Sequence, residues 1–86
     1  MYKAMIRIMP KKGILDPQGV AVGKALAALG YSSVNEVWVG KYMELLVAGD
    51  EPAQVELQVR EMCSRLLSNP VIEDFSFELV EIGGRP

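Results

Sequence analysis

The order of β-rich and helical segments is the feature that most constrains the fold of this chain. Apolar and polar residues alternate in short runs, as they do in strands with one buried face. Two segments between these runs repeat their apolar residues with a helical period instead. The expected strands are residues 1–9, 34–39, 42–48 and 75–80. This β–α–β–β–α–β order predicts an α+β, ferredoxin-like fold, in which two helices cover one face of a four-stranded antiparallel sheet.

The segment GILDPQG, which precedes the first expected helix, carries the signals of a helix start. Asp16 is a suitable N-cap, and Pro17 suits the first helical position. Leu15 and Val20 are spaced as a hydrophobic staple across the cap. We expect the helix to end at Gly30, in the usual position after a C-cap. The stripe expected to be buried contains Val22, Leu26 and Leu29.

Gly19 and Gly23 lie four residues apart on one face of this helix. Each costs roughly 1 kcal/mol of helix stability relative to alanine, so the sequence keeps them at a cost. A glycine face allows another backbone to approach closely. The approaching backbone belongs either to the same domain or to a partner protein, and the sequence leaves both alternatives open.

The second expected helix begins at Pro52 and ends before Asn69-Pro70. Glu56–Arg60 and Glu61–Arg65 are acid-before-base pairs at i, i+4, which indicates a solvated outer face. The stripe predicted to face the core contains Val55, Val59, Met62 and Leu66, flanked by Cys63 and Leu67.

The sheet face away from the helices is expected to carry an unusual number of large side chains. With the other alternating positions turned inward, this predicted self-association face contains Met5, Met9, Trp38, Tyr42 and Leu46. Single exposed apolar residues are normal, but a patch on one face needs covering. We therefore expect this face to be buried in a homo-oligomer joined sheet to sheet.

Length, charge and cysteine content exclude several classes of protein. The 86 residues form one small domain, expected over residues 1–82, with a disordered tail at 83–86. The formal net charge is −2 and no Lys/Arg run occurs, so no nucleic-acid partner is expected. No apolar run is long enough to span a membrane, and the N-terminus lacks a signal-peptide pattern. A single cysteine fits a reducing compartment, so we expect a cytoplasmic location.

The residue types that most catalytic sites need are missing. The chain has no histidine, and its lone cysteine, Cys63, falls in the apolar stripe of the second helix. No metal-ligand spacing or Walker-type phosphate loop occurs, and the neighbouring Glu73 and Asp74 point to opposite faces of a strand. The motifs of RNA-binding domains and small phosphatases with this topology are absent too. We expect no catalytic residue, metal site or cofactor site in this chain.

Three segments together resemble the PurS family, the small subunit of bacterial phosphoribosylformylglycinamidine (FGAM) synthase. They are KKGILDPQGVAVGKALAALGY, VGKYMEL and EMCSRLLSNPVIEDFSFEL, and the resemblance covers roughly residues 2–80. Each motif is short, but their order and spacing are specific. This chain departs from the family pattern at Leu46 and Ala48, where a more polar strand end is usual.

The resemblance implies a non-catalytic subunit of the enzyme that carries out the fourth step of purine synthesis. It implies three partners: further copies of itself, a large synthetase subunit that uses ATP and magnesium, and a glutaminase subunit that releases ammonia from glutamine. The small subunit brings the other two together for ammonia transfer and binds no cofactor. The candidate partner contacts that this resemblance suggests are Asp16, Gln18, Gly19, Lys41 and Tyr42.

One alternative comes from a different class of protein. ACT domains, which sense amino acids, share this topology and bind their ligands at strand–helix loops such as GILDPQG. The sequence also leaves open whether Gly40-Lys41 forms a hairpin or a bend in one long strand, whether the oligomer is a dimer or a tetramer, and which surface meets which subunit.

Overall fold

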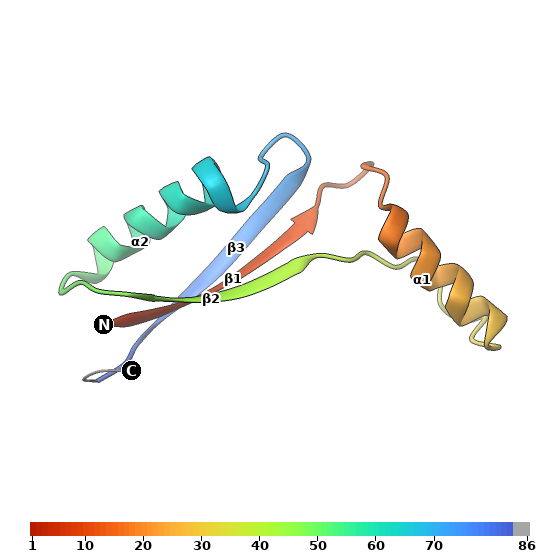
Figure 1. Cartoon of the computed structure of the whole chain (residues 1–86), viewed down its shortest axis with the longest axis horizontal. Coiled ribbons are helices and arrows are strands. Elements are labelled where there is room, and N and C mark those ends of the chain that lie inside the picture. The colour runs from red at the N-terminus through yellow and green to blue at the C-terminus, as the bar shows by residue number, and fades with distance from the viewer. Residues whose placement is uncertain (84–86) are drawn as a thin grey trace.

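The computed structural model describes residues 1–83, which form one antiparallel sheet, two α-helices and a π-helical turn (Figure 1). The sheet has the order β2-β1-β3, so the N-terminal strand lies in the centre. The elements in chain order are β1 (Tyr2–Pro10), α1 (Pro17–Ala28), β2 (Lys41–Val47), α2 (Pro52–Met62), η1 (Cys63–Leu67) and β3 (Glu73–Glu81).

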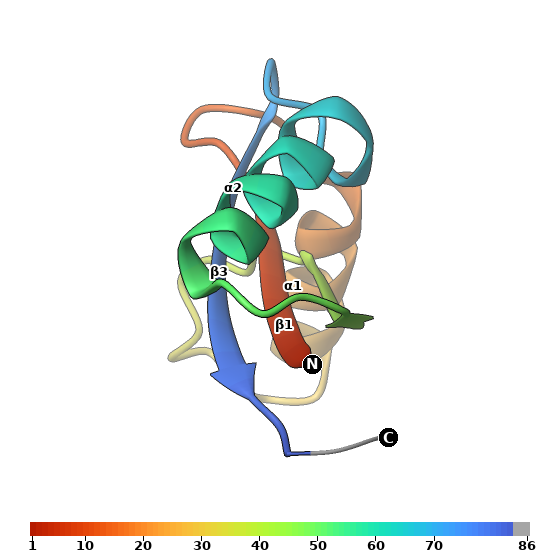
Figure 2. The same ribbon diagram turned by 90° about the vertical axis from the view of Figure 1, so that its left-hand side faces the viewer.

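The core lies between α2 and one face of the sheet (Figure 2). Ile6 and Ile8 on the central strand are fully buried, because strands flank β1 on both sides and α2 lies above it. Ile6 is opposite Met43 on β2 and Phe77 on β3, so one face of all three strands is apolar. From the helical side the core contains Val55, Val59 and Cys63.

The apolar stripe of α2 differs from the predicted one at its C-terminal end. Val55 and Val59 are buried as expected, but Cys63 follows them in the core, and Leu66 is 81% exposed. The π-helical turn at Cys63–Leu67 explains the difference. Because it places an extra residue in the last turn, it rotates Leu67 toward the core in place of Leu66.

The predicted four-stranded sheet is wrong for the single chain, whose described residues form three strands. Residues 34–39 are extended but belong to no strand. A two-residue hairpin at Gly40-Lys41 would need positive φ angles, whereas the only positive-φ glycines in the described part are Gly13 and Gly30. The chain therefore runs through Gly40 without folding back, which decides between the hairpin and the bend.

The prediction that both helices cover one face of the sheet is also wrong for the single chain. Helix α1 projects beyond the end of the sheet instead of packing beside α2 (Figure 1). As a result Val22 and Leu29, predicted to be buried, are 42% and 73% exposed. The radius of gyration is 16.7 Å, against about 12 Å for a compact domain of this length. We call residues 14–40, which contain α1 and the extended segment after it, the arm.

Within the arm the predicted residues at the two ends of α1 are confirmed. Asp16 is the N-cap, Pro17 occupies the first position, and Gly30 has a φ of 97°. The N–H groups of Gly30 and Tyr31 donate to the carbonyl oxygens of Ala27 and Leu26, which is the Schellman arrangement. None of the helices in the described part has the length and hydropathy needed to span a bilayer. Of the predicted tail, residues 84–86 lie outside the described residues.

Candidate functional site

The base of the arm, where α1 begins and the segment before β2 returns, is held together by the Asp16 side chain. Its carboxylate accepts hydrogen bonds from the backbone N–H of Gly19, at 3.0 Å, and of Val39, at 2.7 Å. The first bond caps α1, and the second ties the start of the arm to its end. These two bonds, that to Val39 foremost, hold the pKa of Asp16 below its usual value.

The glycine face of α1 is used inside the chain. A Cβ atom on Gly19 would collide with the carbonyl oxygen of Val37, and Gly19 is buried beneath that residue. At Gly23 a Cβ would lie 3.8 Å from the Val37 side chain, an ordinary contact. Of the two alternatives for the glycine face, the structure therefore selects close approach of a backbone of the same domain.

The sheet face opposite α2, which we call the open face, is crossed by charged groups. Lys3 Nζ lies 3.1 Å from Glu44 Oε1, and the Tyr42 hydroxyl donates to Glu44 Oε2 at 2.7 Å. Arg7 lies over the Tyr42 ring at 5.8 Å, and its Nη1 is 3.8 Å from Glu78 Oε1. The bond from Tyr42 lowers the pKa of Glu44 and raises that of Tyr42. The face is thus more polar than its methionine and leucine positions alone suggest.

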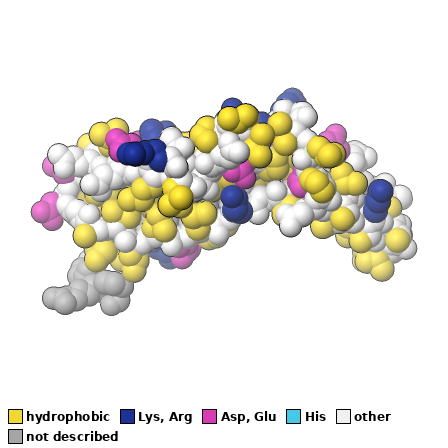
Figure 3. Space-filling model, turned by 45° about the horizontal axis from the view of Figure 1, so that its top comes forward, with side chains coloured by type: hydrophobic (Ala, Val, Ile, Leu, Met, Phe, Trp, Pro, Cys, Tyr) yellow, Lys and Arg dark blue, Asp and Glu magenta, His cyan; other side chains and the backbone are white. Residues whose placement is uncertain are grey.

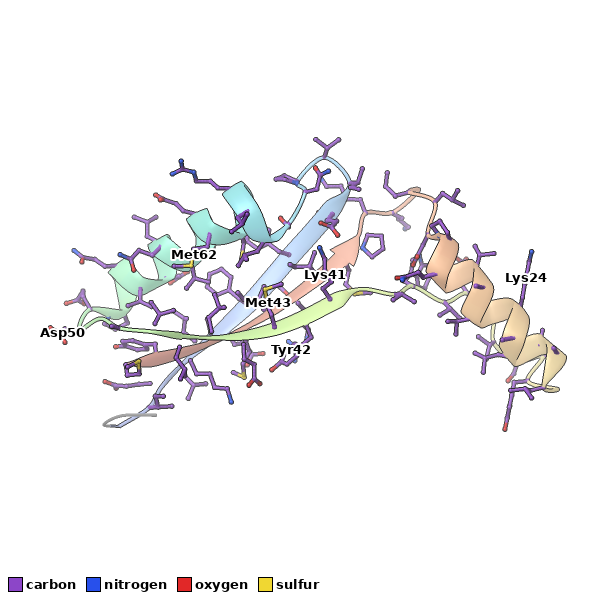
Figure 4. The ribbon with its side chains drawn as sticks, viewed as in Figure 1. Lys24, Lys41, Tyr42, Met43, Asp50 and Met62 are labelled. Carbon is purple, nitrogen blue, oxygen red and sulfur yellow. The ribbon has the colours of Figure 1, made fainter. Side chains whose placement is uncertain are left out.

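Four of the five predicted self-association residues lie on the open face. Strand register puts Met5, Met9, Tyr42 and Leu46 there, and Met5 is half-buried. Trp38 lies in the arm, just before β2, and is 54% exposed. Figure 4 shows Tyr42 and Met43 on opposite sides of β2, with Met43 toward α2. Self-association through these five residues stays a prediction.

A shallow groove lies on the open face where the arm joins the sheet. Its volume is about 360 Å³, and it is lined by Arg7, Met9, Trp38, Gly40, Lys41 and Tyr42. Gly40 lines the groove and has no side chain to fill it. A Cβ atom at this position would collide with the Ile8 carbonyl oxygen and the Met9 sulfur. We call this the junction groove.

The five candidate partner contacts divide into two groups. Asp16 and Gly19 are accounted for by contacts within the arm. Gln18, Lys41 and Tyr42 are exposed, and the last two line the junction groove, so a role in partner contact stays a prediction for these three. Sequence reasoning missed Arg7: alternation placed it on the outer face, but only strand register sets it against Tyr42.

The remaining candidate for chemistry is Cys63, which is fully buried in the core. Burial raises the pKa of its thiol, so the neutral, unreactive form dominates at neutral pH. Within residues 1–83, no three His, Cys, Asp or Glu side chains gather in a way that could hold a metal ion.

Comparison with known proteins decides the family. The model of the PurS family, described as phosphoribosylformylglycinamidine (FGAM) synthase, matches residues 3–81. The chain belongs to the PurS family. PurS is a subunit of FGAM synthase, a ligase of purine biosynthesis, and the chain is 43% identical to the PurS subunit of Bacillus subtilis over 95% of its own length and 96% of that protein.

Solved PurS structures share the fold. The B. subtilis PurS structure superimposes with a TM-score of 0.86 and covers 94% of this chain and 100% of its own. Methanocaldococcus jannaschii PurS, described as one of the subunits of formylglycinamide ribonucleotide amidotransferase, gives 0.84 at 39% identity, over 95% and 99% of the two chains. A chain of the PurLQS structure from Thermotoga maritima, 24% identical, has the same fold at 0.83, over 92% and 96%.

Proposed function

We propose that this PurS-family chain is the non-catalytic subunit that joins a large synthetase subunit and a glutaminase subunit, so that ammonia passes from one to the other. The observation that carries the proposal is the family match over residues 3–81. The exposed arm supports it, because large apolar side chains such as Ile14 and Leu15 lie on its surface. The PurLQS structure of Thermotoga contains a chain of this fold within such an assembly.

The chemistry then belongs to the partner subunits. ATP, magnesium, the ribonucleotide and glutamine bind there, and this chain binds none of them. We place the assembly in the cytoplasm, where purine synthesis has its reducing environment and where a free cysteine such as Cys63 stays a thiol.

The test is amidine synthesis by the purified large subunit and glutaminase, with and without this chain. Each mixture is given either glutamine or ammonium chloride as the nitrogen source. Glutamine-dependent synthesis that needs the chain, together with ammonia-dependent synthesis that does not, is the result expected of a bridging subunit. Equal rates with and without the chain on both nitrogen sources would overturn the proposal.

The ACT-like alternative finds no support at the loop it would use. An amino-acid ligand at GILDPQG would need free polar groups there. The Asp16 carboxylate already accepts from the N–H groups of Gly19 and Val39. Saturable binding of a free amino acid to the isolated chain would revive that alternative.

We further propose that the chain pairs with a second copy, and that the four-stranded ferredoxin-like unit forms between the two. In a single chain the outer edge of β2 has no neighbouring strand, and residues 34–39 are extended without a strand partner. Unpaired strand edges readily bind other strands. Residues 34–39 of one copy fit beside β2 of the other, and the twofold axis makes the exchange mutual.

Helix α1 supports the same arrangement. Helix α1 packs against Val37. Side chains alternate along an extended segment, so Val37 is on the same side of the chain as Met43 and Leu45. That side faces α2. Met43 and Leu45 are only partly buried by α2 alone. An exchanged arm would bring α1 of the second copy over these residues, beside α2. A twelve-residue helix is marginal without tertiary packing, which this contact would supply.

The exchange is tested with a matched pair of variants at the end of α1. Leu29→Glu places a charge where an exposed apolar side chain would be buried, whereas Ala28→Glu adds the same charge one residue earlier. Light scattering should give a dimer for the wild type and Ala28→Glu, and a larger monomer fraction for Leu29→Glu. A wild-type monomer, or a Leu29→Glu dimer of unchanged affinity, would overturn it.

A further inference from the structure

The junction groove combines residue types that dominate the energetic centres of protein interfaces. Trp38 and Tyr42 are each 54% exposed beside it, and Met9 and Arg7 complete its walls. Tryptophan, tyrosine, methionine and arginine are enriched at interface cores, where a few such residues carry most of the binding energy. Its volume of about 360 Å³ accommodates one or two side chains rather than a whole element.

The residues that line the groove are basic or uncharged, and the carboxylates of Glu44 and Glu78 lie beside them on the open face. None of the six lining residues is acidic, and the chain has a formal net charge of −2. The ammonium group of Lys41 lies 3.5 Å from Glu73, so it is already paired. Arg7 is therefore the basic group that faces the groove.

Arg7 retains unused hydrogen-bonding capacity. Its nearest carboxylate oxygen, Oε1 of Glu78, is 3.8 Å from Nη1, which is too far for a hydrogen bond. Both side chains of this ion pair are more than half exposed, so solvent weakens it further. The guanidinium group has five N–H donors in a planar fork, which matches a carboxylate. A carboxylate that enters the groove can thus gain bonds that Glu78 does not make.

We infer that the junction groove docks an acidic segment of one of the other synthase subunits, with a carboxylate on Arg7 and an adjacent apolar side chain against Trp38 and Met9. This inference rests on the proposed function, and it adds the surface and the chemistry of the contact. The groove is open to such a partner in the proposed pair, because it lies on the face opposite the one that α1 and α2 cover.

A second copy is the less suitable occupant of the groove. An isologous contact with its twofold axis at the groove would place Arg7 of one copy near Arg7 of the other, and like charges at an interface oppose binding. The ion pairs of Lys3 and Arg7 also give the open face the mixed character of non-obligate interfaces. Self-association through this face is therefore a competing outcome of the test.

The test measures binding of the wild-type chain, Arg7→Glu and Trp38→Ala to the purified large subunit and to the purified glutaminase, at low and at high salt. We expect Arg7→Glu to weaken binding to one of the two subunits about tenfold or more, and to remove most of the salt dependence. Trp38→Ala should weaken binding to the same subunit. Both side chains are exposed, and circular dichroism checks that the variants fold.

Arg65→Glu is the matched control, because it reverses an exposed charge beyond α2, on the other side of the molecule. It should bind both subunits within about twofold of the wild type. Unchanged binding by Arg7→Glu overturns the inference, and a loss confined to Trp38→Ala overturns its acidic part. Dissociation of the homodimer by Arg7→Glu or Trp38→Ala, seen by light scattering, assigns the groove to self-association instead. Wild-type chain that binds neither subunit overturns the proposed function itself.

Discussion

Asp16 and Val39 are 23 residues apart in the sequence, yet the Asp16 carboxylate accepts a 2.7 Å hydrogen bond from the Val39 N–H. The bond closes the arm at its base, where α1 begins and the extended segment returns to the sheet. The exposed arm is therefore a constrained loop, and its apolar side chains are presented in a fixed arrangement (Figure 3). Preorganised surfaces lose less conformational entropy when they bind.

Replacing Asp16 by asparagine should loosen this closure. One carbonyl oxygen cannot match the two carboxylate oxygens that now accept from Gly19 and Val39. We expect amide hydrogen exchange at these two residues to quicken about fivefold or more, while the strands keep their protection. Asp50→Asn, at an exposed position at the end of the sheet far from the arm (Figure 4), should leave both rates unchanged. Unaltered exchange in Asp16→Asn would show that the closure does not depend on the charge.

The same carboxylate predicts a pH dependence of the arm. The pKa of Asp16 is lower in the folded chain than in the unfolded one, so ionised Asp16 stabilises the fold above the unfolded pKa of about 3.9. This contribution is lost as the pH falls through the pKa that Asp16 has in the folded chain. Exchange at Val39, corrected for the intrinsic effect of pH, should speed up at acid pH in the wild type. Asp16→Asn should show a flatter dependence, and equal slopes would contradict the assignment.

The two helical glycines should respond in opposite ways to alanine. Gly23→Ala removes a helix-destabilising residue without a clash, and should raise the free energy of unfolding by up to about 1 kcal/mol. Gly19→Ala forces the methyl group against the Val37 backbone, and should lower it by about 1–3 kcal/mol. Urea denaturation of both variants provides the measurement. Stabilisation by both would mean that α1 separates easily from the Val37 segment of the arm.

Leu66 and Leu67 test the π-helical turn with one matched substitution. Leu67 packs against the core and Leu66 is exposed, although helical periodicity favoured Leu66. Leu67→Ala should lower the free energy of unfolding by about 1–3 kcal/mol, and Leu66→Ala by less than about 0.5 kcal/mol. Thermal unfolding of the two variants checks this. The reverse order would indicate that α2 continues as a regular α-helix.

Gln18 remains the residue of the first turn with no structural role. It is exposed, and neither the cap nor the Val37 contact uses its side chain. We expect Gln18→Ala to leave the melting temperature unchanged and to weaken assembly with the large subunit. Pull-down with the purified subunit measures this, with Ser33→Ala as the control at another exposed position of the arm. Equal recovery of the large subunit would count against a contact at Gln18.

Local sequence signals determined the parts of this protein that depend on interactions between residues close together in the chain. Alternation in residues 1–9 predicted β1 and its buried face, and Asp16, Pro17 and Gly30 predicted both ends of α1. Caps, staples and periodic stripes act within a few residues, so they can be recognised without the fold. The resemblance to the PurS family was carried by short motifs of this kind and is confirmed by the family match.

Tertiary structure alone decided where those elements go. Residues 34–39 have the composition of a strand, but a strand also needs a neighbour, and the backbone at Gly40 does not turn back to provide one. Val22 and Leu29 form a helical stripe, yet the stripe does not specify which chain buries it. The hydrophobic effect is not directional, so it does not select the surface that covers an apolar side chain. The sequence therefore determined which apolar side chains must be buried. The path of the chain through Gly40 decided that a single copy leaves them exposed.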